Sequence, residues 1–161
     1  MRELGPAERF ATGAVGPPGE RVFYAHVVAN GHPYWFVAEK GQVAALAARA
    51  LELLAEANVL PDPDSVAALL IEAELGEPGE VVFRIGSMAL QIDATELVTV
   101  HMVSVEDDEA VSFIVAPEQL QAMALAGLDV VGQGRPLCPD CRLPMNPAGH
   151  RCPSSNGHHP E

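Results

Sequence analysis

The chain has 161 residues, of which 48% are hydrophobic, so it is long enough to fold around a substantial core. It carries 22 acidic residues against nine Lys and Arg, which gives a formal net charge of −13. This charge repels phosphate backbones and anionic lipid headgroups. The composition therefore disfavours nucleic-acid and membrane binding, and it favours a partner protein that has a basic surface.

Nothing in the sequence predicts export or membrane insertion. No apolar run follows the basic residue Arg2, as it would in a secretory signal. No stretch approaches the roughly 18 consecutive apolar residues that are needed to cross a bilayer. All three cysteines lie within the last 24 residues, which excludes a disulfide scaffold as the source of stability. We therefore expect a cytoplasmic protein.

The first third of the chain predicts three strands and a helix. Residues 9–15 and 21–29 are rich in β-branched and aromatic side chains and are separated by a Gly-Pro-Pro-Gly turn. Asn30-Gly31 is a strong hairpin signal, and residues 34–37 form the next strand-like run. From residue 42 to residue 57 the apolar positions change to helical spacing, which predicts an amphipathic helix.

The remainder of the body repeats this order after a linker at residues 58–80. Asp64 or Ser65 is a candidate N-cap for a short helix that reaches Leu75 within the linker. Strand-like runs follow at residues 81–92, 97–105 and 111–116. Pro117 suits the first turn of a helix, and residues 118–131 return to helical spacing.

The two halves also match in individual residues, which predicts an internal duplication. The offsets between matched residues are 73, 75, 78 and 77 along the chain. They pair Phe10 and Gly13 with Phe83 and Gly86, His26 with His101, Trp35 with Phe113, and Gln42 with Gln119. The fold class expected is α+β, with repeats at about 9–57 and 81–131 related by a pseudo-two-fold axis. Each repeat would supply three antiparallel strands and one helix, and both helices would cover one face of the sheet. This α+β domain would span residues 1–134.

Residues 135–161 form a tail with the spacing of a zinc site. Cys138 and Cys141 form a C-x-x-C pair, and His150 and Cys152 follow after eight intervening residues. Three thiolates and one imidazole complete the closed tetrahedral shell of a structural Zn²⁺ ion. Because the segment is too short and Pro-rich to build a core of its own, metal binding would supply its folding energy. A zinc ion with four protein ligands has no open position and is not expected to be catalytic.

Several alternatives for the tail stay open. His158 or His159 could replace His150 as the fourth ligand, although the shorter loop to His150 orders fewer residues. The tail could also be a reduced segment with incidental thiols, or Cys138 and Cys141 could form a redox disulfide.

His26 and His101 are the weak candidates for chemistry in the body. They occupy equivalent places in the two repeats and could face each other across the pseudo-two-fold axis. Two such imidazoles could bind a second metal ion or transfer protons. The commoner alternative is a half-buried strand histidine that makes one hydrogen bond. No phosphate-binding Gly-rich loop, nucleophile elbow or H-E-x-x-H motif is present in the sequence.

The two ends of the chain resemble a family of uncharacterised bacterial proteins that is widespread in actinobacteria. The resemblance rests on the opening R-F-A-T-G at residues 9–13, on E-K-G-Q-V at residues 39–43, and on C-P-D-C and G-H-R-C-P in the tail. Arg142 stands where the family pattern commonly has Gly. The family carries no assigned activity. The resemblance implies an association with kinase-like and phosphatase-like proteins that are encoded by neighbouring genes.

Together these observations favour a zinc-stabilised, non-enzymatic module that binds a partner protein. The alternative is an enzyme or a sensor of phosphorylated metabolites, with a pocket at the interface between the repeats and His26 and His101 inside it. Nucleic-acid binding through the tail is a third and weaker hypothesis, because only Arg135, Arg142 and Arg151 lie near the site.

Overall fold

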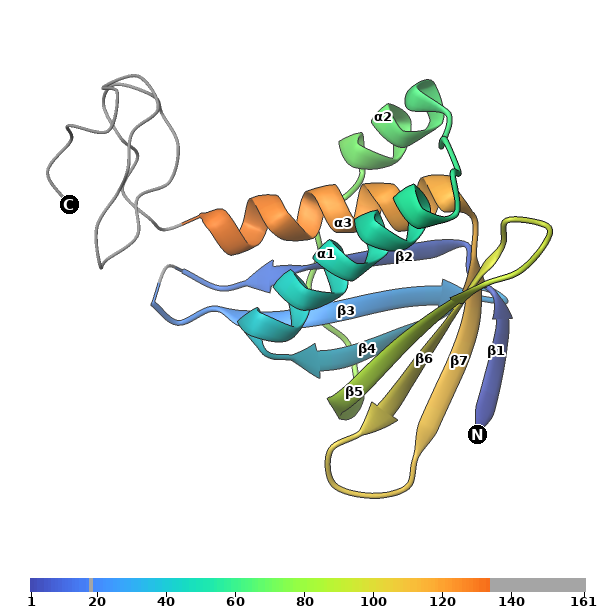
Figure 1. The fold of residues 1–161 in the computed structure, drawn as a ribbon. Coiled ribbons are helices and arrows are strands. Elements are labelled where there is room, and N and C mark those ends of the chain that lie inside the picture. Colours follow the sequence, from blue (N-terminus) through green and yellow to red (C-terminus); the bar gives the residue numbers. More distant parts are fainter. Residues whose placement is uncertain (18, 134–161) are drawn as a thin grey trace, which may run out of the picture. The chain divides into compact units, whose positions relative to one another are not determined.

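The computed structural model describes residues 1–17 and 19–133, and these residues form one seven-stranded sheet and three α-helices (Figure 1). The expected α+β fold with two repeats is confirmed. The tail at residues 135–161 and its boundary with the body lie outside the described residues.

The first repeat is an antiparallel meander followed by a helix. Its strands are β2 (Arg9–Val15), β3 (Val22–Ala29) and β4 (His32–Ala38). Asn30 and Gly31 both adopt positive φ, which matches the tight turn that their sequence predicts between β3 and β4. Helix α1 (Lys40–Glu56) begins with a capping box in which Glu39 and Gln42 bind each other's backbone N–H groups.

A second helix, α2 (Pro63–Ile71), belongs to the linker between the repeats. Its N-cap is Asp62, whose side chain accepts a hydrogen bond from the Ser65 N–H at 3.1 Å. The prediction that Asp64 or Ser65 caps a helix reaching Leu75 is therefore wrong. Pro63 occupies the first turn, where it needs no donor, and this moves the helix start two residues toward the N-terminus.

The second repeat has the same order of elements. Its strands are β5 (Val81–Ile92), β6 (Val98–Ser104) and β7 (Ala110–Val115), and helix α3 (Pro117–Gly132) follows them. Burial alternates strictly along β6, as expected for a strand with one face in the core.

One strand, β1 (Arg2–Pro6), has no counterpart among the sequence expectations, and it closes the sheet. The strand order is β1-β7-β6-β5-β4-β3-β2, with β1 parallel to β7 and β4 parallel to β5. The Ala7 N–H donates to Ile114 of β7 at 2.8 Å, and the next N–H, of Glu8, donates to Val28 of β3 at 2.7 Å. The continuous segment 2–15 therefore forms both edge strands of the sheet and links them through the backbone.

Strand β5 likewise pairs with strands of both repeats. Its first residues pair with β4 in parallel, and from Ile85 onward it pairs with β6 in antiparallel register. Ala11 lies opposite His26, and Ala89 lies opposite His101, so the first strands of the repeats correspond with a shift of 78 residues.

This register corrects three of the matches expected from the sequence, and one of them is Gly13, which corresponds to Gln91 and not to Gly86. Phe10 corresponds to Met88 and not to Phe83, because the first strands differ by 78 positions and not by 73. Trp35 corresponds to Ser112 and not to Phe113, because these residues lie opposite the equivalent histidines. Apolar residues recur at short intervals in strands, so sequence matching alone tolerates such slips.

Helices α1 and α3 lie on one face of the sheet, and they form the core with it (Figure 1). Gly127 of α3 packs against β2 and α1, since an added Cβ would lie 2.6 Å from the Thr12 hydroxyl and 3.2 Å from Val43. Residues 72–80 cross the other face of the sheet. There Gly79 lies over the Trp35 ring, and the Arg9 guanidinium binds the carbonyl groups of residues 72 and 74.

Two equivalent glutamines join the repeats. Gln42 of α1 accepts the Glu39 N–H through Oε1 at 2.8 Å and donates through Nε2 to the Ile85 carbonyl at 2.9 Å. Gln119 of α3 accepts the Ala116 N–H at 2.8 Å and donates to the Ala7 carbonyl at 2.9 Å. Each glutamine side chain thus accepts a hydrogen bond from the backbone at the start of its own helix. It also donates one to the other repeat, where the chain passes between the repeats.

We expect Gln119→Glu to destabilise the protein by about 1–3 kcal/mol, because the carboxylate loses the donor and faces the Ala7 carbonyl. Gln42→Glu should behave alike through Ile85. Chemical denaturation of the full chain measures both effects. The control is Gln121→Glu on the same helix, where the side chain makes no hydrogen bond within the described part of the chain. Equal losses for Gln119→Glu and Gln121→Glu would contradict the role assigned to Gln119.

Candidate functional site

The predicted zinc ligands Cys138, Cys141, His150 and Cys152 lie outside the described residues, as do His158 and His159. Within residues 1–17 and 19–133, no group of three or more His, Cys, Asp or Glu side chains is arranged to hold a metal ion. The zinc site therefore stays a prediction from the sequence.

His26 lies on the face of the sheet that is opposite the two helices. Its ring stacks on Trp35 with a centroid distance of 4.0 Å and an interplanar angle of 16°. Arg9 donates through Nε to the His26 Nδ1 at 3.4 Å. Because Nδ1 acts as an acceptor, the ring proton is on Nε2, which is buried and has no partner among the described residues.

These surroundings favour the neutral imidazole. Burial, and then the positive charge of Arg9, lower the pKa of His26 from 6.5 to about 4. A protonated ring would be a donor at both nitrogens, so it would lose the contact with Arg9. His26 is therefore a neutral, packed side chain at neutral pH.

His101 occupies the equivalent place in β6 but has different surroundings. It lies opposite Ser112, whereas His26 lies opposite Trp35, and its Nε2 contacts the Gln91 Oε1 at 3.3 Å. Strands β4 and β5 separate β3 from β6 in the sheet, so the two histidines are about 14 Å or more apart. The structure confirms that the two positions are equivalent, but the imidazoles do not face each other.

The two most exposed large apolar residues, Leu60 and Ile71, lie just before α2 and at its end. A shallow groove between α2 and α3 has an apolar floor, and we call this floor the α2–α3 surface. It consists of Leu60, Val66, Ala67, Leu70 and Leu125. The Leu60 side chain is 94% exposed, and the neighbouring Ile71 of α2 is 84% exposed. Single exposed apolar side chains are common on protein surfaces, but a contiguous group of them is typical of a binding surface.

Carboxylates surround the α2–α3 surface. Glu118 of α3 accepts the Asp62 N–H at 2.8 Å and so fixes α2 against α3. Both of these residues line the groove, and Asp64 lies in the first turn of α2. Residues 57–80 and 117–133 contain eight Asp or Glu and no Lys or Arg. The local charge is therefore negative around an apolar floor.

Neither this surface nor the role of the two glutamines was predicted from the sequence. The signal for the surface was the cation-free stretch 57–80, in which apolar Leu60 and Ile71 fall next to acidic residues. The signal for the glutamines was their equivalence in the duplication, which was noted without a role. Helical periodicity gave no warning, because Leu60 lies outside α2 and Ile71 is its last residue.

The fold and these surfaces define an α+β protein that is built from two interlocked repeats and has an acidic, partly apolar face. The chain belongs to the family described as protein of unknown function (DUF3090), whose model matches residues 3–152. The matched residues include the four predicted zinc ligands. Neither the curated proteins nor the solved structures contain a significant match to the chain. None of the described helices is both long and apolar enough to span a bilayer.

The lowered pKa of His26 makes stability depend on pH in a defined window. Between about pH 6.5 and about pH 4 the unfolded chain binds more protons at this site than the folded chain does. The free energy of unfolding should therefore fall as the pH is lowered through this window. His26→Gln should remove this part of the dependence.

Denaturant titrations of the full chain at several pH values measure the effect. The matched control is His101→Gln, which makes the same change at the equivalent position of the second repeat, and the slope of His26→Gln is compared with it. A wild-type slope in His26→Gln would show that His26 is not the group responsible.

Proposed function

We propose that this protein is a non-enzymatic interaction module, in which an acidic α+β body and a zinc-binding tail present surfaces to a partner protein. The observation that carries the proposal is the α2–α3 surface. It combines exposed Leu60 and Leu125 with an acidic rim in a fold whose core is otherwise well covered.

The charge pattern indicates the class of partner. The carboxylates around the α2–α3 surface repel nucleic acid and anionic membranes, and they attract Lys and Arg. A basic amphipathic helix fits best, because its apolar side chains can enter the groove while its cations meet the rim. The resemblance noted in the sequence makes a kinase-like or phosphatase-like protein the first partner to test.

Changing the exposed apolar residues should abolish partner binding without unfolding the protein. We expect the double variant Leu60→Ser and Ala67→Arg to weaken binding on the order of tenfold or more, because it removes an apolar side chain from the groove and adds a cation that repels a basic partner. Its stability should stay within about 0.5 kcal/mol of wild type, since both side chains are exposed. Quantitative affinity purification of the full chain, followed by binding assays with the purified partner, measures this.

Val105→Ser provides the matched control, since Val105 is 54% exposed and lies outside the α2–α3 surface. A basic protein bound by wild type and by Val105→Ser, but lost from the double variant, supports the proposal. Retention of every bound protein by the double variant would contradict it.

The zinc ion belongs to the same proposal. The C-x-x-C pair and the His150–Cys152 pair supply three thiolates and one imidazole, a donor set that suits structural Zn²⁺. The family match extends to Cys152, the last of these residues. Arg142 does not alter the donor set. A closed shell of this kind would hold the tail in one shape and would make the tail a second surface for protein contacts.

Elemental mass spectrometry of untagged full chain purified without added metal should find one zinc ion per chain. Cys138→Ser and His150→Ala should lose it, because each removes one of the four ligands. His158→Ala and His159→Ala serve as controls and should retain it. Loss of zinc from a control with retention in His150→Ala would reassign the fourth ligand. Absence of zinc from the wild type would remove the site.

The runner-up is an enzyme or a sensor of phosphorylated metabolites. Its supporting observation is that grooves do form between the two repeats, and one of them has a volume of about 310 Å³. His26 and His101 line neither of the two interface grooves. Thermal stabilisation of the full chain by a member of a phosphorylated-metabolite panel would favour this alternative. A melting temperature that no member of the panel raises would favour the interaction module.

A further inference from the structure

Two grooves in the body are equivalent under the pseudo-two-fold relation. Each lies between the helix of one repeat and the first strand of the other, and the wall residues correspond with shifts of 78 along the strands and 77 along the helices. The α3–β2 groove is lined by residues 8–11, Gln119, Ala122, Met123 and Ala126. The α1–β5 groove is lined by residues 86–89, Gln42, Ala45, Leu46 and Arg49.

The α3–β2 groove is covered by the chain's own linker. Leu69, Glu72 and Ala73 line it from the outside and reduce its volume to about 100 Å³. The segment is held by its backbone, because the Arg9 guanidinium donates to the carbonyl oxygens of Glu72 and Glu74. This groove is thus covered by the last turn of α2 and the residues that follow it, which bring the apolar Leu69 side chain to its walls and carbonyl groups to Arg9.

The α1–β5 groove has the same walls, and no part of the described chain covers it. Its volume is about 310 Å³. Equivalent wall residues are correspondingly more exposed, since Ala122 and Ala11 are buried whereas Ala45 and Ala89 are exposed.

The strand wall of this groove is an unprotected edge. Beyond Ile85, β5 pairs with β6 on one side, and on the other side no strand pairs with it within the described part of the chain. Residues 85–92 contain no charged residue and no proline, the two devices that most often protect an edge from pairing with another chain. The corresponding edge of β2 carries Arg9 and is crossed by the linker.

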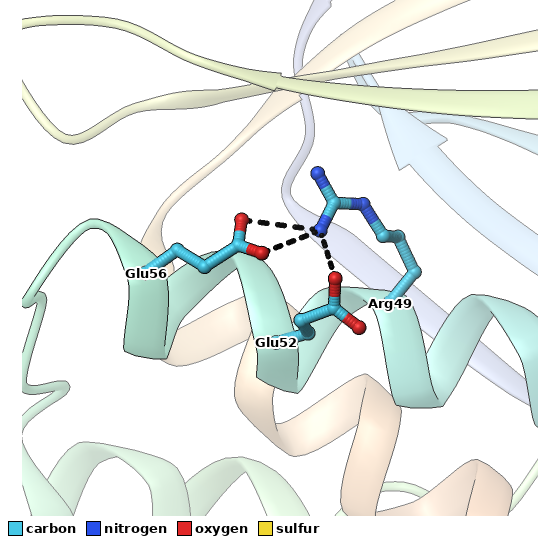
Figure 2. Close-up of polar contacts among 3 residues, drawn as sticks. All are labelled: Arg49, Glu52 and Glu56. Atoms are coloured by element: carbon cyan, nitrogen blue, oxygen red, sulfur yellow. Dashed lines mark hydrogen bonds and ion pairs between the residues drawn. The ribbon is translucent and has the colours of Figure 1, made fainter.

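Arg49 supplies the groove with the guanidinium that Arg9 supplies to its counterpart. It stands on the helix wall, and its NH1 donates to Glu52 at 2.8 Å and to Glu56 at 3.3 Å (Figure 2). These carboxylates occupy one of its three nitrogens, and the other two make no hydrogen bond within the described part of the chain. Arg49 can therefore bind carbonyl groups on an incoming segment while the two glutamates hold its side chain in place.

We propose that the α1–β5 groove binds an extended segment of a partner protein, which adds to the free edge of β5 as a strand. Its backbone would pair with residues 86–90, and its apolar side chains would pack on Leu46, Met88 and Leu90. Its carbonyl groups would meet Arg49. This site is separate from the α2–α3 surface, so it does not depend on the function proposed for that surface.

The test uses the full chain and a phage-displayed library of random peptides about eight residues long, the usual length of a paired strand. Ala45→Arg places a long side chain at the centre of the groove, and Ala48→Arg makes the same change at an exposed position on α1 outside it. Selected peptides should bind wild type and Ala48→Arg alike, and Ala45→Arg about tenfold or more weakly. Arg49→Ala should weaken them too. Amide hydrogen exchange within residues 86–92 should slow when a selected peptide is added.

Two results would overturn the proposal. Peptides that bind Ala45→Arg as tightly as wild type, or no enrichment on wild type, would show that the groove is not a peptide site. Edge amides of residues 86–92 that are already protected in the free full chain would show that this chain, or a second copy of it, occupies the edge. Dependence of that protection on protein concentration separates these two occupants. Loss of binding by the Leu60→Ser and Ala67→Arg variant instead would place the peptide on the α2–α3 surface.

Discussion

Helices α1 and α3 are each fixed to the opposite repeat by one glutamine, and this constraint determines the geometry of the body. Gln42 and Gln119 bind the carbonyl groups of Ile85 and Ala7, the points at which β5 and the segment 2–15 pass from one repeat to the other. Each position needs an acceptor for a backbone N–H at the start of the helix and a donor for a strand carbonyl group. Only a side chain that has both a donor and an acceptor, such as Gln, can make the two hydrogen bonds together. The repeats therefore interlock, and the two grooves between them follow from that arrangement.

The two surfaces proposed for binding follow from the way the linker makes the repeats unequal. Helix α2 and residues 72–80 cover one groove and one outer face of the sheet, which encloses Trp35 and keeps His26 neutral. The equivalent groove is left open, and α2 itself adds exposed apolar residues in an acidic setting. The differences between the halves, more than their likeness, mark the surfaces proposed for binding. Neither surface contains the histidines that the duplication first suggested.

Most of the architecture was predictable from the sequence, because helical and strand periodicity and the Asn30-Gly31 turn act locally. The duplication was predictable too, including the equivalence of His26 with His101 and of Gln42 with Gln119. Strand β1 and both parallel pairings were not, since they depend on contacts between distant segments. The shift of 78 in the first strands was missed because Phe10 and Phe83 are both buried aromatic residues, although they are not equivalent. The cysteine and histidine motif of the tail is recognisable from the sequence alone, because residue type and spacing define it.

The central claim is that two interlocked repeats close one sheet, and amide hydrogen exchange of the full chain by NMR tests it most directly. The N–H groups of Ala7, Glu8 and Val105 bind carbonyl groups of Ile114, Val28 and Arg84 at the two crossovers. All three should exchange as slowly as amides inside the strands of each meander. Fast exchange at Ala7 and Glu8, with slow exchange within β3 and β6, would show that the sheet is open and that the repeats do not interlock there.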